Sequence, residues 1–261
     1  MKKILITNDD GFDSEGLQAL IEAMRPLGHV TVVAPATEKS ACGHSLTLTR
    51  PLRFVRVDDD FFKLDDGTPS DCIYLAIHTF FKSGELPDLV VSGINKGSNM
   101  GEDITYSGTA SAAMEAVLQG VPAISFSQVY DSGPASLDNY KYDLAKKYAH
   151  NIAKKVLEGG FPLEARKFLN VNIPQIKISE CKGLKITHAG YKKYSNDAQL
   201  HRNPRGEEHY WLGIHILNWE PSKNRTCDLS AIEDGFVSIS PIKLDMSAYE
   251  DIDRLKEWID E

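Results

Sequence analysis

Short β-branched runs alternate with helical patterns through the first two-thirds of this chain. Residues 4–6, 30–33, 89–91 and 123–126 are predicted strands, and residues 14–27 form the first predicted helix. Repeated strand–helix–strand succession is typical of a parallel sheet with helices on both faces. The sequence therefore predicts an α/β fold with a doubly wound, mostly parallel, Rossmann-like sheet.

Further local signals place two more helices and an edge strand. Thr68 and Asp71 form a capping box, with Pro69 in the first turn, that opens a helix expected to end near residues 83–84. Residues 143–157 carry one apolar face and end at two glycines, as an amphipathic helix does. Residues 54–57 alternate like a half-exposed strand.

The pattern changes after about residue 175. A polar segment, 192–206, and an aromatic, β-prone segment, 209–219, together predict a projecting hairpin. Residues 246–259 are predicted to close the chain as an amphipathic helix. We therefore expect a Rossmann-like core over residues 1–175. Residues 176–261 would form an extension with a hairpin, a return strand and a terminal helix, used in oligomerisation.

Composition excludes several classes of function. The 29 basic and 37 acidic residues give a net charge of −8, which disfavours nonspecific binding to nucleic acid or an anionic membrane. The four cysteines have no Cys-x-x-Cys spacing, which argues against a structural zinc site and a disulfide framework. With neither a signal-peptide pattern nor a membrane-length apolar run, the chain is expected to be cytoplasmic.

Two adjacent carboxylates, Asp9 and Asp10, follow the first predicted strand. The carboxyl ends of strands are where open α/β sheets place their ligands. Neighbouring carboxylates in a cleft repel unless a cation or a shared proton offsets their charge. A hard divalent cation with oxygen ligands would do so. Asp10-Gly11 making only a tight turn is an equally good explanation at this point.

Other polar clusters follow other strands and reach the same edge of the sheet. Ser40 offers a hydroxyl, Asn95 offers a carbonyl oxygen, and Gly97 lets backbone N–H groups approach an anion. Residues 107–109, Ser-Gly-Thr, open an alanine-rich helix whose N-terminus is suited to a phosphate. Each cluster also has a plain explanation as a loop serine, a connecting loop or a helix cap. Their convergence after strands favours the functional one.

Several ordered motifs resemble the SurE (survival protein E) family. They are Asn8-Asp9-Asp10-Gly11, Gly43-His44-Ser45-Leu46-Thr47, Gly67-Thr68-Pro69-Ser70-Asp71-Cys72, Ser92-Gly93-Ile94-Asn95-Lys96-Gly97, Tyr106-Ser107-Gly108-Thr109 and Asp234-Gly235-Phe236-Val237-Ser238-Ile239-Ser240-Pro241. The resemblance covers residues 2–126, weakens over 127–225, and returns near 226–245. One departure is Ser40-Ala41, where the family has a Ser-Gly pair.

The resemblance implies a metal-dependent 5′-nucleotidase that hydrolyses nucleoside monophosphates by water attack. It implies that one divalent cation, Mg²⁺, Mn²⁺ or Co²⁺, is held by Asp9, Asp10, Ser40 and Asn95. It also implies that Ser107, Gly108 and Thr109 lie against the substrate phosphate. We expect Asn95 and Gly97 to contact the phosphate as well. Asp9 or Asp10 would accept a proton, and we favour Asp9. A homodimer or homotetramer held by C-terminal segments is expected.

Alternatives remain open at this stage. A covalent aspartyl-phosphate phosphatase needs Asp-x-Asp after its first strand, and an NAD-dependent enzyme needs G-x-G-x-x-G, and neither pattern is present. A non-catalytic metal–nucleotide-binding regulatory module would use the same loops. His44 shares a loop with Ser40 but is not expected to act as a nucleophile, and Asp228 would reach the cleft if the chain folds back.

Overall fold

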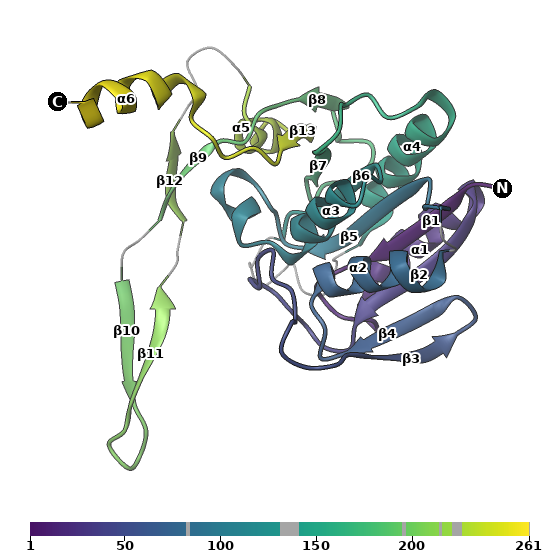
Figure 1. Cartoon of the computed structure of the whole chain (residues 1–261), viewed down its shortest axis with the longest axis horizontal. Helices are drawn as coiled ribbons and strands as arrows, with labels where there is room; N and C mark the ends of the chain where they lie inside the picture. The colour runs from purple at the N-terminus through teal and green to yellow at the C-terminus, as the bar shows by residue number, and fades with distance from the viewer. Residues whose placement is uncertain (82–83, 131–140, 195–196, 214–215, 221–225, 261) are drawn as a thin grey trace.

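The computed structural model describes residues 1–81, 84–130, 141–194, 197–213, 216–220 and 226–260. A nine-stranded sheet runs through its centre (Figure 1). In spatial order its strands are β3 (Arg53–Asp58), β4 (Phe61–Asp65), β2 (His29–Pro35), β1 (Lys3–Thr7), β5 (Leu89–Lys96), β6 (Ala123–Gln128), β7 (Lys167–Ile173), β13 (Val237–Lys243) and β8 (Leu184–Ile186).

The order of the strands reverses between β1 and β5. From β1 the chain proceeds to β2 and β4 on one side, and it then returns to β5 on the other side and continues to β6 and β7. All of these neighbours pair in parallel, whereas β3 and β13 join antiparallel. The predicted doubly wound, mostly parallel sheet is confirmed. A reversal of this kind opens a crevice at the carboxyl ends of the two central strands.

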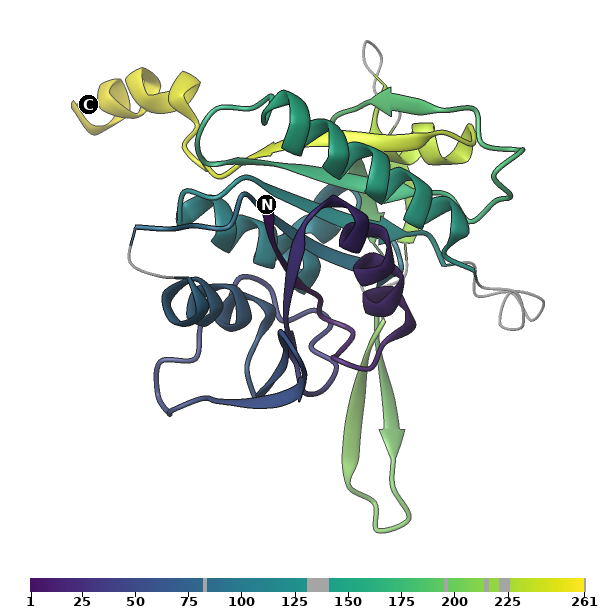
Figure 2. The ribbon, with the colours of Figure 1, turned by 90° about the vertical axis from the view of Figure 1, so that its right-hand side faces the viewer.

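Two pairs of helices cover the faces of the sheet (Figure 2). Helices α1 (Glu15–Met24) and α4 (Asp143–Gly159) pack on one face, with Leu20 and Ile152 in their shared core. Helices α2 (Pro69–Phe80) and α3 (Gly108–Leu118) pack on the other face. Every parallel strand of the centre is therefore buried on both sides, which explains its continuous apolar sequence.

Local capping sets where the helices begin. The Ser14 hydroxyl accepts a hydrogen bond from the Leu17 N–H at the start of α1. Thr68 and Asp71 form the predicted capping box of α2. Helix α2 ends at Phe80, earlier than the predicted end near residues 83–84, because Phe81 is already extended. Residue 83 lies outside the described residues.

Strand β5 is longer than predicted. The sequence indicated a glycine-rich loop from Ser92 onward, but β5 continues to Lys96 through a register shift, with Asn95 opposite Ser127 on β6. Gly93 adopts a φ of 126°, which only glycine tolerates easily, and so permits the irregularity. Asn95 is therefore held by a paired strand at the central crevice.

The predicted projecting hairpin is present in two paired segments (Figure 1). Strands β9 (Tyr191–Tyr194) and β12 (Ile216–Glu220) pair at its base, and β10 (Asp197–Arg202) and β11 (Glu208–Gly213) pair beyond them.

The rest of the C-terminal region returns to the main sheet and then leaves it. A short helix, α5 (Asp228–Glu233), precedes β13, which pairs with β7 and β8. The terminal helix α6 (Ile252–Asp260) follows a 3₁₀ turn at Tyr249–Asp251. The predicted start at residue 246 is wrong, because the Ser247 N–H bonds the Asp245 carboxylate and residues 246–248 are not helical. A division of the chain at residue 175 stays a prediction.

Within the described part of the chain, no helix combines the length and the apolar character that crossing a bilayer requires.

A substitution at Gly16 tests how closely α1 packs on β5. A Cβ atom at this position would lie 2.0 Å from the Ile94 carbonyl oxygen. We expect Gly16→Ala to lower the free energy of unfolding by about 2 kcal/mol through overpacking. This is despite a gain of about 1 kcal/mol in helix propensity. Urea unfolding measures the change, with exposed Gln18→Ala on the same helix as the control. A Gly16→Ala variant as stable as the wild type would contradict this packing.

Candidate active site

Asp9 and Asp10 lie in the turn that carries the chain from β1 into α1. Asn8 orders this turn, because its side-chain amide donates to the Gly11 carbonyl oxygen at 2.9 Å and to the Ser14 hydroxyl at 2.8 Å. Asp9 is only 3% exposed, whereas Asp10 is partly exposed. The turn thus presents one buried and one accessible carboxylate at the β1/β5 crevice.

Thr109, in the first turn of α3, binds Asp9 with both of its donors. The Thr109 N–H donates to Asp9 Oδ2 at 3.0 Å, and the Thr109 hydroxyl donates to Asp9 Oδ1. The neighbouring Gly108 makes room for this contact, since a Cβ there would lie 2.8 Å from Asp9 Cβ. A carboxylate against the N-terminus of a helix is also favoured by the helix dipole.

The other carboxylate contacts the end of β5. Asp10 Oδ2 accepts a hydrogen bond from the Lys96 N–H at 3.2 Å. Beside it, Asn95 Nδ2 donates to the Gly97 carbonyl oxygen at 2.9 Å, which leaves Asn95 Oδ1 as the branch suited to a cation. The structure therefore brings Asp9, Asp10, Asn95 and the start of α3 to one place.

The loop that contains Ser40 lies against the same turn. The Lys39 N–H donates to the Asp9 carbonyl oxygen at 2.7 Å, one residue before Ser40. The exposed Ser40 hydroxyl donates to Glu38 Oε1 at 2.8 Å. Ala41, which departs from the Ser-Gly pair of the resembled motif, has a φ of 56°, a conformation that favours glycine. The loop therefore keeps a backbone conformation typical of glycine although the residue is alanine.

Burial and repulsion from neighbouring carboxylates raise the pKa of both carboxyls. Burial raises the pKa of Asp9 from 3.8 to about 6, with Asp10 adding repulsion and the two Thr109 hydrogen bonds opposing the shift. Burial also raises the pKa of Asp10, with Glu38 adding repulsion and the Lys96 N–H opposing it. Glu38 is not predicted as a site residue from the sequence, since its proximity to Asp10 depends on how the loop folds. Concentrated negative charge of this kind is what a bound cation offsets.

Some hydrogen-bond donors at the N-terminus of α3 are already bonded within the protein. The Ser107 hydroxyl accepts from the Ala110 N–H at 3.0 Å as the helix cap. Both donors of Thr109 serve Asp9. Of the predicted phosphate-binding residues, Ser107 and Thr109 thus also build the site, while Gly108 brings the backbone close to Asp9.

The donor set fits a hard divalent cation. Among the described residues, no three His, Cys, Asp or Glu side chains gather as a metal site. A site here therefore needs mixed oxygen donors, and two carboxylates, an amide oxygen and a nearby hydroxyl are such a set. Oxygen-only coordination suits Mg²⁺ or Mn²⁺ better than Zn²⁺.

The two remaining candidates of the sequence analysis take supporting places. His44 Nε2 bonds Glu115 Oε2 at 2.9 Å, which ties the Ser40 loop to the middle of α3. Asp228 does fold back, but it binds the N–H groups of Gly101 and Gly190, each at 2.9 Å, and holds the chain between β5 and α3.

Comparison with known proteins bears on this arrangement directly. The profile of the family described as Survival protein SurE matches residues 4–196. The chain belongs to the SurE family. It is 60% identical over 261 residues to the 5′-nucleotidase SurE of Wolinella succinogenes, covering 99% of this chain and 100% of that one. It is 57% identical over 260 residues to the protein of the same name from Aliarcobacter butzleri, with 99% of each chain covered.

A solved structure of the family has the same fold. The crystal structure of the SurE protein from Aquifex aeolicus superposes with a TM-score of 0.84 at 39% identity, covering 99% of this chain and 100% of that chain. SurE membership thus extends through the middle region, where motif resemblance alone was weakest.

The raised pKa of Asp9 predicts a pH-dependent stability cost in metal-free protein. The pKa of such a carboxyl is higher in the folded state than in the unfolded state. Once the pH is high enough to ionise it in both states, it contributes less to the free energy of unfolding. Its contribution therefore falls by about 3 kcal/mol as pH rises from about 4 to about 6. Relative to wild type in chelator, we expect Asp9→Asn to become progressively more stable over this range. Urea unfolding from pH 4 to 7 measures the difference, with exposed Asp13→Asn as control. Parallel curves for wild type and Asp9→Asn would contradict the assignment.

Proposed function

We propose that this SurE chain is a metal-dependent 5′-nucleotidase that hydrolyses nucleoside 5′-monophosphates to nucleoside and phosphate. Full-length relatives that carry the name 5′-nucleotidase support the activity. The observation that carries the proposal is the buried bond between Asp9 and Thr109, which puts paired carboxylates beside a helix N-terminus. Carboxylates bind cations and helix N-termini bind phosphate, so the expected sites for the cation and the phosphate lie next to each other.

Asp9, Asp10, Ser40 and Asn95 would hold one divalent cation, Mg²⁺, Mn²⁺ or Co²⁺. When bound, such a cation supplies positive charge that offsets the charge of the reacting phosphate. Ser40 would join this set if its exposed hydroxyl turned from Glu38 toward Asp9.

The chain's own groups would orient the phosphate and accept a proton. The Gly108 backbone and the positive end of the α3 dipole would attract the anion, and Asn95 and Gly97 would contact it too. Asp9 is our preferred proton acceptor from the attacking water, because its buried carboxylate lies against the helix N-terminus where the phosphate would bind. Thr109 keeps its carboxylate oriented during the transfer.

Phosphate release from AMP tests the proposal. We expect turnover with Mn²⁺ or Mg²⁺ and none in excess chelator. We expect Asp9→Asn to lose activity by about 10²–10⁴-fold or more, because a ligand and a base are removed together. Asp13→Asn, an exposed aspartate four residues away, should keep wild-type activity. Full activity of Asp9→Asn, or of chelated wild type, would refute this site.

The same assay separates the alternatives. A regulatory metal–nucleotide-binding module would bind AMP and release no phosphate. A covalent aspartyl-phosphate enzyme would leave a labelled protein after acid quench. We favour direct water attack because the paired aspartates are adjacent and Thr109 already engages both oxygens of Asp9.

The proposal includes a homodimer or homotetramer and a cytoplasmic location. Large apolar side chains are exposed on the hairpin and on α6, and a second copy of this chain would cover them. They include Leu200, Tyr210, Trp211, Leu212, Ile252, Leu255, Trp258 and Ile259. The four free cysteines suit a reducing compartment.

Light scattering on eluted protein tests the assembly. We expect wild type to have at least twice the chain mass, and we expect Trp211→Asp and Trp258→Asp to shift it toward monomer because each puts a charge into an apolar contact. Lys256→Ala on α6 is the matched control. A monomeric wild type, or wild-type mass in both aspartate variants, would contradict it.

A further inference from the structure

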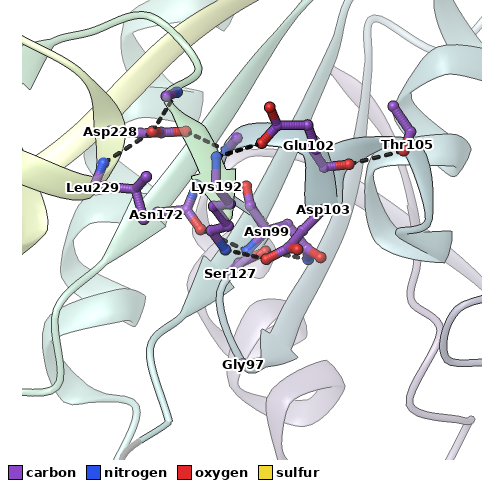
Figure 3. A network of polar contacts seen from close by, with 12 residues as sticks. Gly97, Asn99, Glu102, Asp103, Thr105, Ser127, Asn172, Lys192, Asp228 and Leu229 are labelled. Atoms are coloured by element: carbon purple, nitrogen blue, oxygen red, sulfur yellow. Dashed lines mark hydrogen bonds and ion pairs between the residues drawn. The ribbon is translucent and has the colours of Figure 1, made fainter. Parts of the chain in front are cut away.

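The chain between β5 and α3 connects the two halves of the proposed site. Asn95 lies before it and Ser107–Thr109 follow it, so its conformation sets how the phosphate-binding turn faces the carboxylates. Segments distant in sequence hold this connection through a network of polar contacts (Figure 3). The first half of the connection and the second are held by different parts of the protein.

Asn99 fixes the first half against β6 and β7. Its N–H donates to Asn172 Oδ1 at 2.9 Å, and its side-chain amide donates to the Ser127 hydroxyl at 2.8 Å. Its carbonyl oxygen accepts from the side chains of Asn170 and Asn172. All four residues are buried, so this half is rigidly attached to the sheet.

The base of the hairpin holds the second half. The Lys192 side chain on β9 has no solvent-exposed surface, and its ammonium group pairs with Asp103. The Lys192 N–H also donates to Glu102 Oε2 at 2.7 Å. Gly101 lies so close to the residue before this strand that a Cβ there would be 2.6 Å from the Gly190 carbonyl oxygen. The hairpin therefore clamps the 3₁₀ turn Gly101–Thr105.

The backbone of Asp103 links the 3₁₀ turn to the N-terminus of α3. Its carbonyl oxygen accepts from the N–H groups of Tyr106 and Ser107, each at 3.0 Å. The Ser107 hydroxyl then caps α3, and Thr109 in the next turn binds Asp9. An unbroken series of contacts thus leads from Lys192 on the hairpin to Asp9.

Burying a lysine side chain has a desolvation cost that an apolar side chain of similar volume would not have. Replacing a buried ion pair by apolar residues of similar volume is often neutral or stabilising, so packing alone does not account for it. What a charge pair adds is a fixed direction for both partners, here for the turn that leads into α3.

We propose that Lys192 is a positioning residue of the hydrolytic reaction, which orients the phosphate-binding turn through Asp103. The inference rests on the proposed function for its kinetic consequence, but the clamp itself is independent of activity. It makes the hairpin a supporting part of the active site in addition to any role in assembly.

Kinetics test the consequence. At a temperature well below unfolding, we expect Lys192→Met to lower kcat/KM for AMP by at least about tenfold, since small misplacements of binding groups cost up to about 10²-fold. The inhibition constant for inorganic phosphate should rise alongside it. Lys192→Arg, which keeps the charge, should recover most of the loss. Lys185→Met breaks a surface ion pair with Asp234, 3.0 Å long, and should change neither constant.

Amide hydrogen exchange tests the clamp without using activity. We expect peptides spanning residues 101–110 to lose protection in Lys192→Met and to keep it in Lys185→Met and Lys192→Arg. If Lys192→Met is too unstable, the double variant Lys192→Met/Asp103→Asn leaves no unpaired buried charge and should show the same local loss.

The outcomes distinguish the two proposals. An inactive wild type whose 101–110 peptides lose protection on Lys192→Met refutes the nucleotidase and retains the clamp. An active wild type with unchanged kcat/KM, phosphate inhibition and exchange in Lys192→Met refutes the positioning role and retains the nucleotidase.

Discussion

The hydrogen bonds between Asp9 and Thr109 join the end of the first strand to the first turn of a helix that begins a hundred residues later. They satisfy a carboxylate that is almost completely buried, where an unpaired charge would be strongly destabilising. They also fix the distance between the carboxylate turn and the helix N-terminus. In the proposed function, this fixed arrangement would limit the reorganisation needed at the moment of reaction.

This arrangement concentrates charge that the rest of the fold has to tolerate. Burial raises the pKa values of Asp9 and Asp10, and repulsion from Asp10 on Asp9 and from Glu38 on Asp10 adds to this. Perturbed carboxyls gathered in a crevice are typical of functional sites. The surrounding apolar layers, with Leu5 and Ile6 of β1 fully buried, hold the turn in place against this repulsion.

Support for the site comes from the part of the chain least marked by motifs. Asn170, Asn172 and Lys192 belong to the middle region, yet they hold the connection between β5 and α3. The Asn170 and Asn172 side chains bind backbone groups of Asn99, so many local sequences around them would serve equally well. A positioning network can therefore be essential to a site without leaving a recognisable motif.

The sequence alone determined the features of the fold and the site that depend on residues close together along the chain. The alternating pattern predicted the doubly wound sheet, Ser14 and the Thr68–Asp71 box predicted where α1 and α2 begin, and Asp9-Asp10 after a strand predicted the crevice. Each of these follows from periodicity, capping or the position of a residue after a strand. Strands β4, β7 and β8 were missed, and so was the continuation of β5 to Lys96, because pairing partners far along the chain stabilise them. Only the tertiary structure decided that Thr109 engages Asp9, that Glu38 raises the pKa of Asp10, and that Lys192 holds Asp103. Such contacts depend on where folded segments meet, which no local spacing records.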